Sequence, residues 1–152
     1  MKKNLITFIL CWVFLQTNAQ ITEYTTTKKN WQLYGQIKTI GPAKASLEYI
    51  ANSHDSSFLL MMYDDRPELK TYFSIRFNSN GSTLSSFYNI LISFFEKENW
   101  KNKDYVRFFK LGTEEVSVYK TAVIGTKTII LKTDKGRIAL RKGEIKKLFN
   151  KK

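Results

Sequence analysis

The chain has 152 residues and a formal net charge of +12 at pH 7, from 25 lysine and arginine against 13 aspartate and glutamate residues. Its length suits one domain, and a hydrophobic content of 43% is enough for an apolar core. One cysteine and one histidine exclude an intrachain disulfide and the usual cysteine- and histidine-rich zinc sites. The fold must therefore rely on apolar burial, and the positive charge favours anionic partners.

The first 19 residues have the three parts of a secretory signal. Lys2 and Lys3 form a positive end, residues 5–15 form an apolar run, and the small residues Thr17 and Ala19 precede a cleavage site. A helix over this apolar run would rise only about 16 Å, whereas crossing the hydrocarbon of a bilayer takes about 30 Å. We therefore expect residues 1–19 to be a signal peptide that is removed, and the protein not to span a membrane.

Cleavage is expected between Ala19 and Gln20, with export to a bacterial periplasm or the extracellular space. Cys11 lies inside the apolar run and not at its end, which argues against a lipid anchor, and the cysteine leaves with the signal. The expected mature chain is thus free of disulfides. Residues 20–30 are polar and without apolar periodicity, so we expect a flexible lead-in before a single domain over 31–152.

The positive charge is concentrated near the C-terminus. Removing Lys2 and Lys3 leaves 23 basic against 13 acidic residues. Residues 20–119 carry 12 basic and 11 acidic residues, whereas residues 120–152 carry 11 basic and 2 acidic residues. Such a field attracts anions, although a solvated lysine-rich face without a specific partner is the simpler alternative.

The first half of the expected domain reads as four strands and a helix. Apolar residues alternate over 31–40, 45–51 and 70–78, which is typical of half-buried strands. The uninterrupted apolar run 58–63 predicts a strand covered on both faces. The period then changes over 83–98, where a stripe at three-and-four spacing predicts an amphipathic helix, capped by Ser82 or Thr83. The stripe comprises Leu84, Phe87, Tyr88, Leu91, Ile92, Phe94 and Phe95.

The second half reads as four more strands, over 104–111, 115–123, 127–133 and 137–141, and a short helix over 144–150. Asp134–Gly136 predicts a three-residue hairpin loop, in which Gly136 is free to take a positive φ. Such a loop places Ile130 opposite Leu140, and Leu131 opposite Ala139. We therefore predict an α+β fold with a mostly antiparallel sheet of about seven to eight strands, one long amphipathic helix and a short C-terminal helix. A strand–helix order that occurs twice also suggests a weak two-fold repeat.

No catalytic, metal or cofactor motif stands out. His54 lies in a turn-forming segment, NSHDSS, and adjacent residues of a turn rarely converge on one reacting atom. Asp64, Asp65 and Glu68 lack the spacing of a calcium loop, so we expect a solvated turn. We expect no cofactor and no enzymatic activity, although a hydrolase with dispersed residues stays open as an alternative. Its mark would be a closed pocket with two of four carboxylates, namely Glu48, Asp55, Asp104 and Glu114.

Two groups of residues are candidate binding surfaces. One is an aromatic and basic surface in the segment 100–110, unless its rings belong to the core: Trp100, Lys101, Lys103, Tyr105 and Arg107. The other is an anion-binding surface in the C-terminal third: Lys132, Lys135, Arg137, Arg141, Lys142, Lys146 and Lys147. Arg137 and Arg141 have the same parity on one strand, so their side chains project to the same side, about 13 Å apart.

These observations predict an exported, non-catalytic binding domain whose basic C-terminal third contacts an anionic partner of the envelope or the extracellular space. Anionic lipid, polysaccharide and a protein are the candidate partners, and specific nucleic-acid binding is not expected. The alternative is a protein-interaction module, such as an inhibitor, an assembly factor or a self-associating structural protein, that uses apolar surface.

Overall fold

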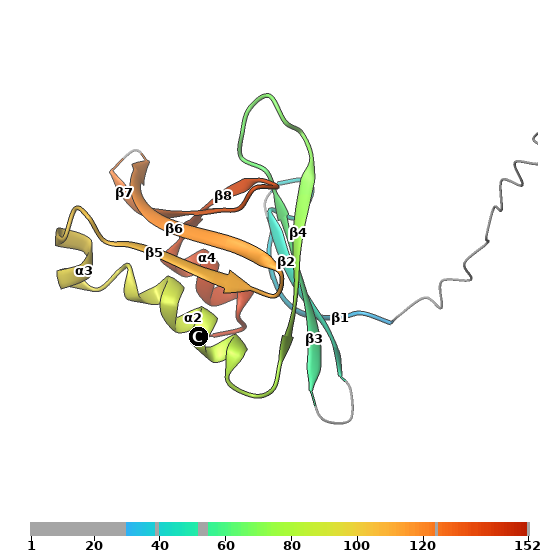
Figure 1. The fold of residues 1–152 in the computed structure, drawn as a ribbon. Helices are drawn as coiled ribbons and strands as arrows, with labels where there is room; N and C mark the ends of the chain where they lie inside the picture. Colours follow the sequence, from blue (N-terminus) through green and yellow to red (C-terminus); the bar gives the residue numbers. More distant parts are fainter. Residues whose placement is uncertain (1–29, 39, 52–54, 124, 152) are drawn as a thin grey trace, which may run out of the picture.

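A computed structural model describes residues 30–38, 40–51, 55–123 and 125–151 of the chain. These residues form eight strands and three helices, which confirms the α+β class. The predicted signal peptide, its cleavage site, nearly all of the lead-in and His54 lie outside the described residues. The eight strands divide into two antiparallel sheets of four, and the strands of the two sheets cross steeply (Figure 1).

The first sheet contains β1 (Gln32–Ile37), β2 (Ala45–Ala51), β3 (Ser56–Tyr63) and β4 (Tyr72–Ser79), paired in that order. Its inner face is apolar, and one cross-strand row joins Leu47, Leu60 and Ile75, all fully buried. The prediction that β3 is covered on both faces is wrong. Burial alternates along this strand, because no other described element lies over the outer face of the sheet, so residues 59, 61 and 63 are only half-buried.

The predicted helix over 83–98 is broken into α2 (Thr83–Ser93) and α3 (Lys97–Lys101). After Ser93 the backbone tightens, with Phe95 N–H donating to Ile92 O, and the turn buries Phe94 completely. The Asn99 side chain then donates to Ser93 O at 2.9 Å, satisfying a carbonyl at the end of α2. Ser82 makes no side-chain capping bond. The first-turn N–H of Leu84 donates instead to the Ser79 hydroxyl, at 3.3 Å.

The second sheet contains β5 (Val106–Leu111), β6 (Glu114–Val123), β7 (Thr126–Lys132) and β8 (Arg137–Arg141), again paired in chain order. The predicted register of the β7–β8 hairpin is wrong by one residue: Ile130 pairs with Ala139, and Leu131 pairs with Ile138. The reason is that Thr133 N–H donates to Gly136 O at 2.9 Å, which shortens the loop to Asp134 and Lys135.

Gly136 does not use its freedom to take a positive φ, and a glycine is needed at this position for space instead. A Cβ at residue 136 would lie 2.5 Å from Asp64 Oδ2 and 2.5 Å from the Phe73 ring. The hairpin therefore packs against the end of the first sheet through a position where only glycine fits.

One hydrophobic cluster joins both sheets to α2 and α4 (Lys142–Leu148), the helix that was predicted over 144–150. Both helices lie on one side of the second sheet (Figure 1). Ile145, Leu148 and Phe149 are buried there, and Phe149 meets the Phe87 ring edge-on at 5.4 Å between centroids. Each half of the chain is thus a four-stranded meander followed by helix, consistent with the predicted two-fold repeat. This packing leaves the other side of the second sheet uncovered by the helices.

Candidate functional site

The uncovered side of the second sheet is the outer face, and it carries the second sheet's most exposed aromatic residue. Because side chains alternate along a strand, burial of Val118, Leu131 and Ile138 in the core turns their strand neighbours outward. One outward cross-strand row follows from the register: Phe108, Ser117, Lys132 and Arg137. The Phe108 side chain is 80% exposed. A phenyl ring and two cations thus share one row about 14 Å long.

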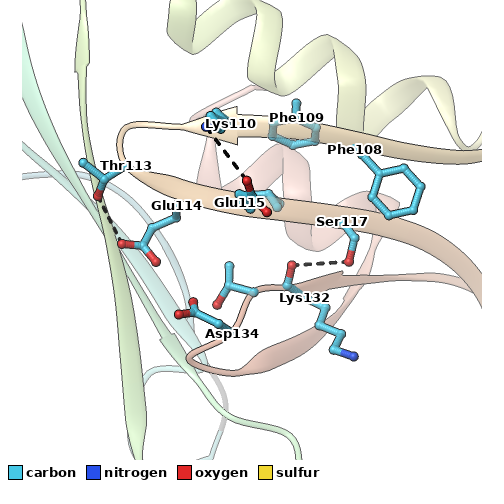
Figure 2. Close-up of a pocket in the computed structure, with 11 residues that line it drawn as sticks. Phe108, Phe109, Lys110, Thr113, Glu114, Glu115, Ser117, Lys132 and Asp134 are labelled. Carbon is cyan, nitrogen blue, oxygen red and sulfur yellow. Dashed lines mark hydrogen bonds and ion pairs between the residues drawn. The ribbon is translucent and has the colours of Figure 1, made fainter.

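This row crosses an open groove of about 820 Å³ (Figure 2). Phe108 and Lys132 lie at one end of it, and Glu114 and Asp134 lie at the other (Figure 2). The groove is lined by Phe108, Phe109, Lys110, Thr113, Glu114, Glu115, Val116, Ser117, Lys132, Thr133 and Asp134. Only Glu114 of the four carboxylates named for the hydrolase alternative lines it. Such a surface offers ring stacking, ammonium contacts and hydrogen bonds.

Ion pairs close the acidic end of the groove. Lys135 Nζ lies 2.6 Å from Glu114 Oε1 and holds the pKa of that carboxyl below its usual range, with help from the Thr113 hydroxyl. Lys110 lies 3.9 Å from Glu115, and both side chains are largely exposed, so this pair is weak. Among the described residues, Lys132 makes no ion pair, and its ammonium stays available to a ligand.

A buried polar cluster at the junction of the two sheets holds the hairpin beside this groove. Asp64 is fully buried and accepts bonds from the backbone N–H and the guanidinium of Arg66, at 2.5–3.1 Å. Arg66 lowers the pKa of Asp64, and the backbone N–H of Arg137 contributes. Arg66 also donates to Lys135 O at 3.3 Å, and Asp65 accepts from Arg137 Nε at 2.9 Å. The prediction of a solvated turn at Asp64 is therefore wrong.

The seven candidate anion-binding residues fall on two sides of the molecule. Lys132, Arg137 and Arg141 project from the outer face of the second sheet, as the strand parity predicts. Lys142, Lys146 and Lys147 lie on α4, which covers the opposite face of the sheet. Lys135 and Arg137 are already engaged with Glu114 and Asp65. The basic third thus does not form one continuous face.

The aromatic and basic surface predicted over 100–107 is mostly structural. Tyr105 packs against Phe94 at 4.8 Å and hydrogen-bonds to Ser93, so its ring belongs to the core. Trp100 is half-buried and stacks on Phe95 at 6.3 Å. Lys101, Lys103 and Arg107 are exposed, and none of them is among the cations found over an aromatic ring of the described residues.

Two lysines that the sequence analysis did not connect to Trp100 lie over its ring instead. Lys127 is 5.0 Å and Lys120 is 6.0 Å from the ring centroid. Lys120 also donates to the carbonyls of Asn99, Trp100 and Asn102, at the C-terminal end of α3. The Lys120 ammonium therefore satisfies backbone carbonyls at the end of the short helix α3.

No family model matches the chain, and no curated protein or solved structure matches it. Within the described residues, none of the helices has the length and apolar character needed to cross a membrane. The same part of the chain holds no group of three or more histidine, cysteine or acidic residues arranged to bind a metal ion. The surface chemistry of the second sheet is therefore the basis for a functional proposal.

Proposed function

We propose that the protein is an exported, non-catalytic binding domain that contacts an anionic partner through its basic C-terminal third. The observation that supports this most directly is the outward row in which the 80% exposed Phe108 is followed by Ser117, Lys132 and Arg137. An exposed ring excludes water from a contact, and adjacent cations add charge-assisted hydrogen bonds. Export follows from the signal-like residues 1–19, with cleavage between Ala19 and Gln20.

The two sides of the basic third differ in what they offer. The outer face combines Lys132 and Arg141 with an exposed ring and a groove, whereas α4 offers only Lys142, Lys146 and Lys147 on its solvent side. Charge alone gives weak, non-selective attraction that salt screens over about 8–10 Å. The outer face of the second sheet is thus the better contact surface.

Two double variants with equal net charge test this proposal. Lys132→Gln with Arg141→Gln acts on the sheet side, and Lys146→Gln with Lys147→Gln acts on the helix side. Arg137 is left intact because its pair with Asp65 supports the fold. Binding to phosphatidylglycerol vesicles, an acidic polysaccharide and polyglutamate is measured against salt concentration. We expect the sheet-side variant to lose about tenfold or more in affinity for the ligand class that binds, and the helix-side variant much less. Equal losses would contradict the proposal.

The outer face of the first sheet supports a second candidate function, protein interaction through apolar surface. Leu33 is 58% exposed there, and Tyr72, which is 41% exposed, packs edge-on against Tyr63 at 5.3 Å. Leu59 and Met61 are half-buried on the same face. Self-association that does not change with salt, and that is lost on Leu33→Ser with Met61→Ser, would favour this function over the first.

A further inference from the structure

Strand β5 forms an edge of the second sheet, and its outward backbone groups find no bonding partner among the described residues. The two-residue turn Gly112–Thr113 makes Leu111 and Glu114 a hydrogen-bonded pair. Bonding then alternates, so residues 107 and 109 bond to β6, whereas Val106, Phe108 and Lys110 direct their N–H and C=O groups away from the sheet. No backbone of the described residues outside β6 bonds to these groups.

Strand β8 forms the opposite edge of the sheet and shows the same alternation of bonded and outward residues. Starting from the bonded pair of Thr133 and Gly136, alternation along β8 turns the backbone of Arg137 outward. Asp65 N–H indeed donates to Arg137 O at 3.0 Å. Within the described residues the chain thus covers β8 at Arg137 with its own loop, and no loop pairs with the backbone of β5 in this way.

The side chains of β5 favour an acidic partner over a second copy of the chain. Val106 is 38% and Phe108 is 80% exposed on the outer face, which makes this an apolar edge of a kind that proteins usually protect. Arg107 and Lys110 are exposed on the same strand, and Lys103 precedes it. Pairing of β5 with the β5 strand of a second copy would bring like charges close together, which is unfavourable. An acidic strand would instead complement the cations of β5.

We propose that β5 binds an extended acidic segment of a partner protein by strand addition. The inference rests on the proposed function, because it names the class of the anionic partner. Residues 106–110 span about 14 Å, enough to pair with about five residues of an extended peptide. In an antiparallel addition, the residues of the added strand that bond to Val106 and Phe108 place their side chains on the outer face beside the Phe108 ring, and the alternate residues place theirs on the face of Arg107.

Backbone methylation of a synthetic peptide tests this without changing the protein. The probe is a capped peptide of about eight residues that alternates valine and glutamate. When the peptide pairs antiparallel to β5 and a valine packs on Phe108, the valine N–H groups bond to β5 and the glutamate N–H groups point away. We therefore expect an analogue methylated at the valine nitrogens to bind about tenfold or more weakly than the parent, and one methylated at the glutamate nitrogens to bind like the parent. Equal binding of the two analogues would overturn strand addition.

A substitution in β5 separates this inference from the proposed function. Val106→Pro removes an outward N–H at the first residue of β5, where proline is tolerated, and it leaves the β5–β6 bonds and the Phe108 ring in place. Peptide binding should be lost while polyglutamate still binds in a salt-dependent way through Lys132 and Arg141. A peptide that never binds, while polyglutamate does, overturns strand addition and leaves the proposed function standing. If the peptide, polyglutamate, the vesicles and the polysaccharide all fail to bind, both strand addition and the proposed function are overturned. Dimers that Val106→Pro dissociates would identify a second copy as the occupant and overturn the acidic partner.

Discussion

Replacing Asp64 by asparagine should destabilise the protein strongly for a residue in a loop. Its carboxylate is fully buried and accepts four bonds from Arg66, at 2.5–3.1 Å. Asparagine keeps the shape but removes the charge and places an amide donor against the guanidinium donors. Hydrogen bonds to charged groups contribute about 1.5–3 kcal/mol, and the Arg66 side chain, which is 32% exposed, can recover part of its hydration. We expect a loss of about 2 kcal/mol, or roughly 6–8 °C in Tm.

Asp65→Asn is the matched control for this substitution. The Asp65 and Arg137 side chains are 28% and 43% exposed, so solvent weakens their ion pair and its loss should cost less than about 1 kcal/mol. Both variants are compared with the unchanged protein by urea unfolding followed with circular dichroism. Equal losses from the two substitutions would refute the claim that Asp64 is the buried centre of the junction.

The pH dependence of the Asp64→Asn effect follows from the direction of the pKa shift. Arg66 lowers the pKa of Asp64 in the folded state, so the folded protein favours the carboxylate more than the unfolded chain does. The resulting stability is present above the unfolded pKa of about 3.9 and is lost as the pH falls through the lower, folded value. The difference between the unchanged protein and Asp64→Asn should be constant near neutral pH and should shrink below about pH 4. A difference that grows on acidification would refute the reasoning.

Two further predictions concern local packing. Gly136→Ala should lower the free energy of unfolding, measured in urea, by about 1–3 kcal/mol, because its Cβ would lie 2.5 Å from Asp64 Oδ2. The Cβ of Gly143→Ala would meet nothing within 4 Å, so this substitution should leave stability unchanged or raise it by up to about 1 kcal/mol. The same sign for both would contradict the packing at Gly136. Lys120→Met should speed amide exchange over residues 97–101 by removing the donor at the end of α3, and Lys127→Met, which loses only a contact with the Trp100 ring, should change it little. Equal exchange in both variants would show that Lys120 does not support the helix.

Local periodicity was enough to predict most of the elements, because alternation and three-and-four spacing depend on neighbouring residues. The stripe of α2 and the alternation of β4 are examples, and both are present in the structure. The division into two sheets depends on which strands meet in space, and the sequence pattern does not contain that information. The predicted register of the β7–β8 hairpin was wrong for a similar reason, since the register depends on whether Thr133 pairs with Gly136.

The candidate site was predicted only in part. The outward direction of Arg137 and Arg141 follows from strand parity and agrees with the structure. Phe108 was missed because both faces of VRFFKL carry apolar residues, so parity alone does not identify the exposed one. Its cross-strand neighbours Ser117 and Lys132 are polar, and this was the available signal once the register was known. The burial of Asp64 depends on residues about 70 positions away, which no local pattern reveals.

Mapping of backbone amide chemical shifts on addition of polyglutamate tests the central proposal most directly. If the outer face of the second sheet is the contact surface, the perturbed amides should cluster over 106–110, 117, 132 and 137–141, and high salt should reverse the shifts. Residues 46, 61 and 74, on the outer face of the first sheet, should not respond. Shifts concentrated on α4, or spread evenly over all basic residues, would contradict the proposal that this face binds the anionic partner.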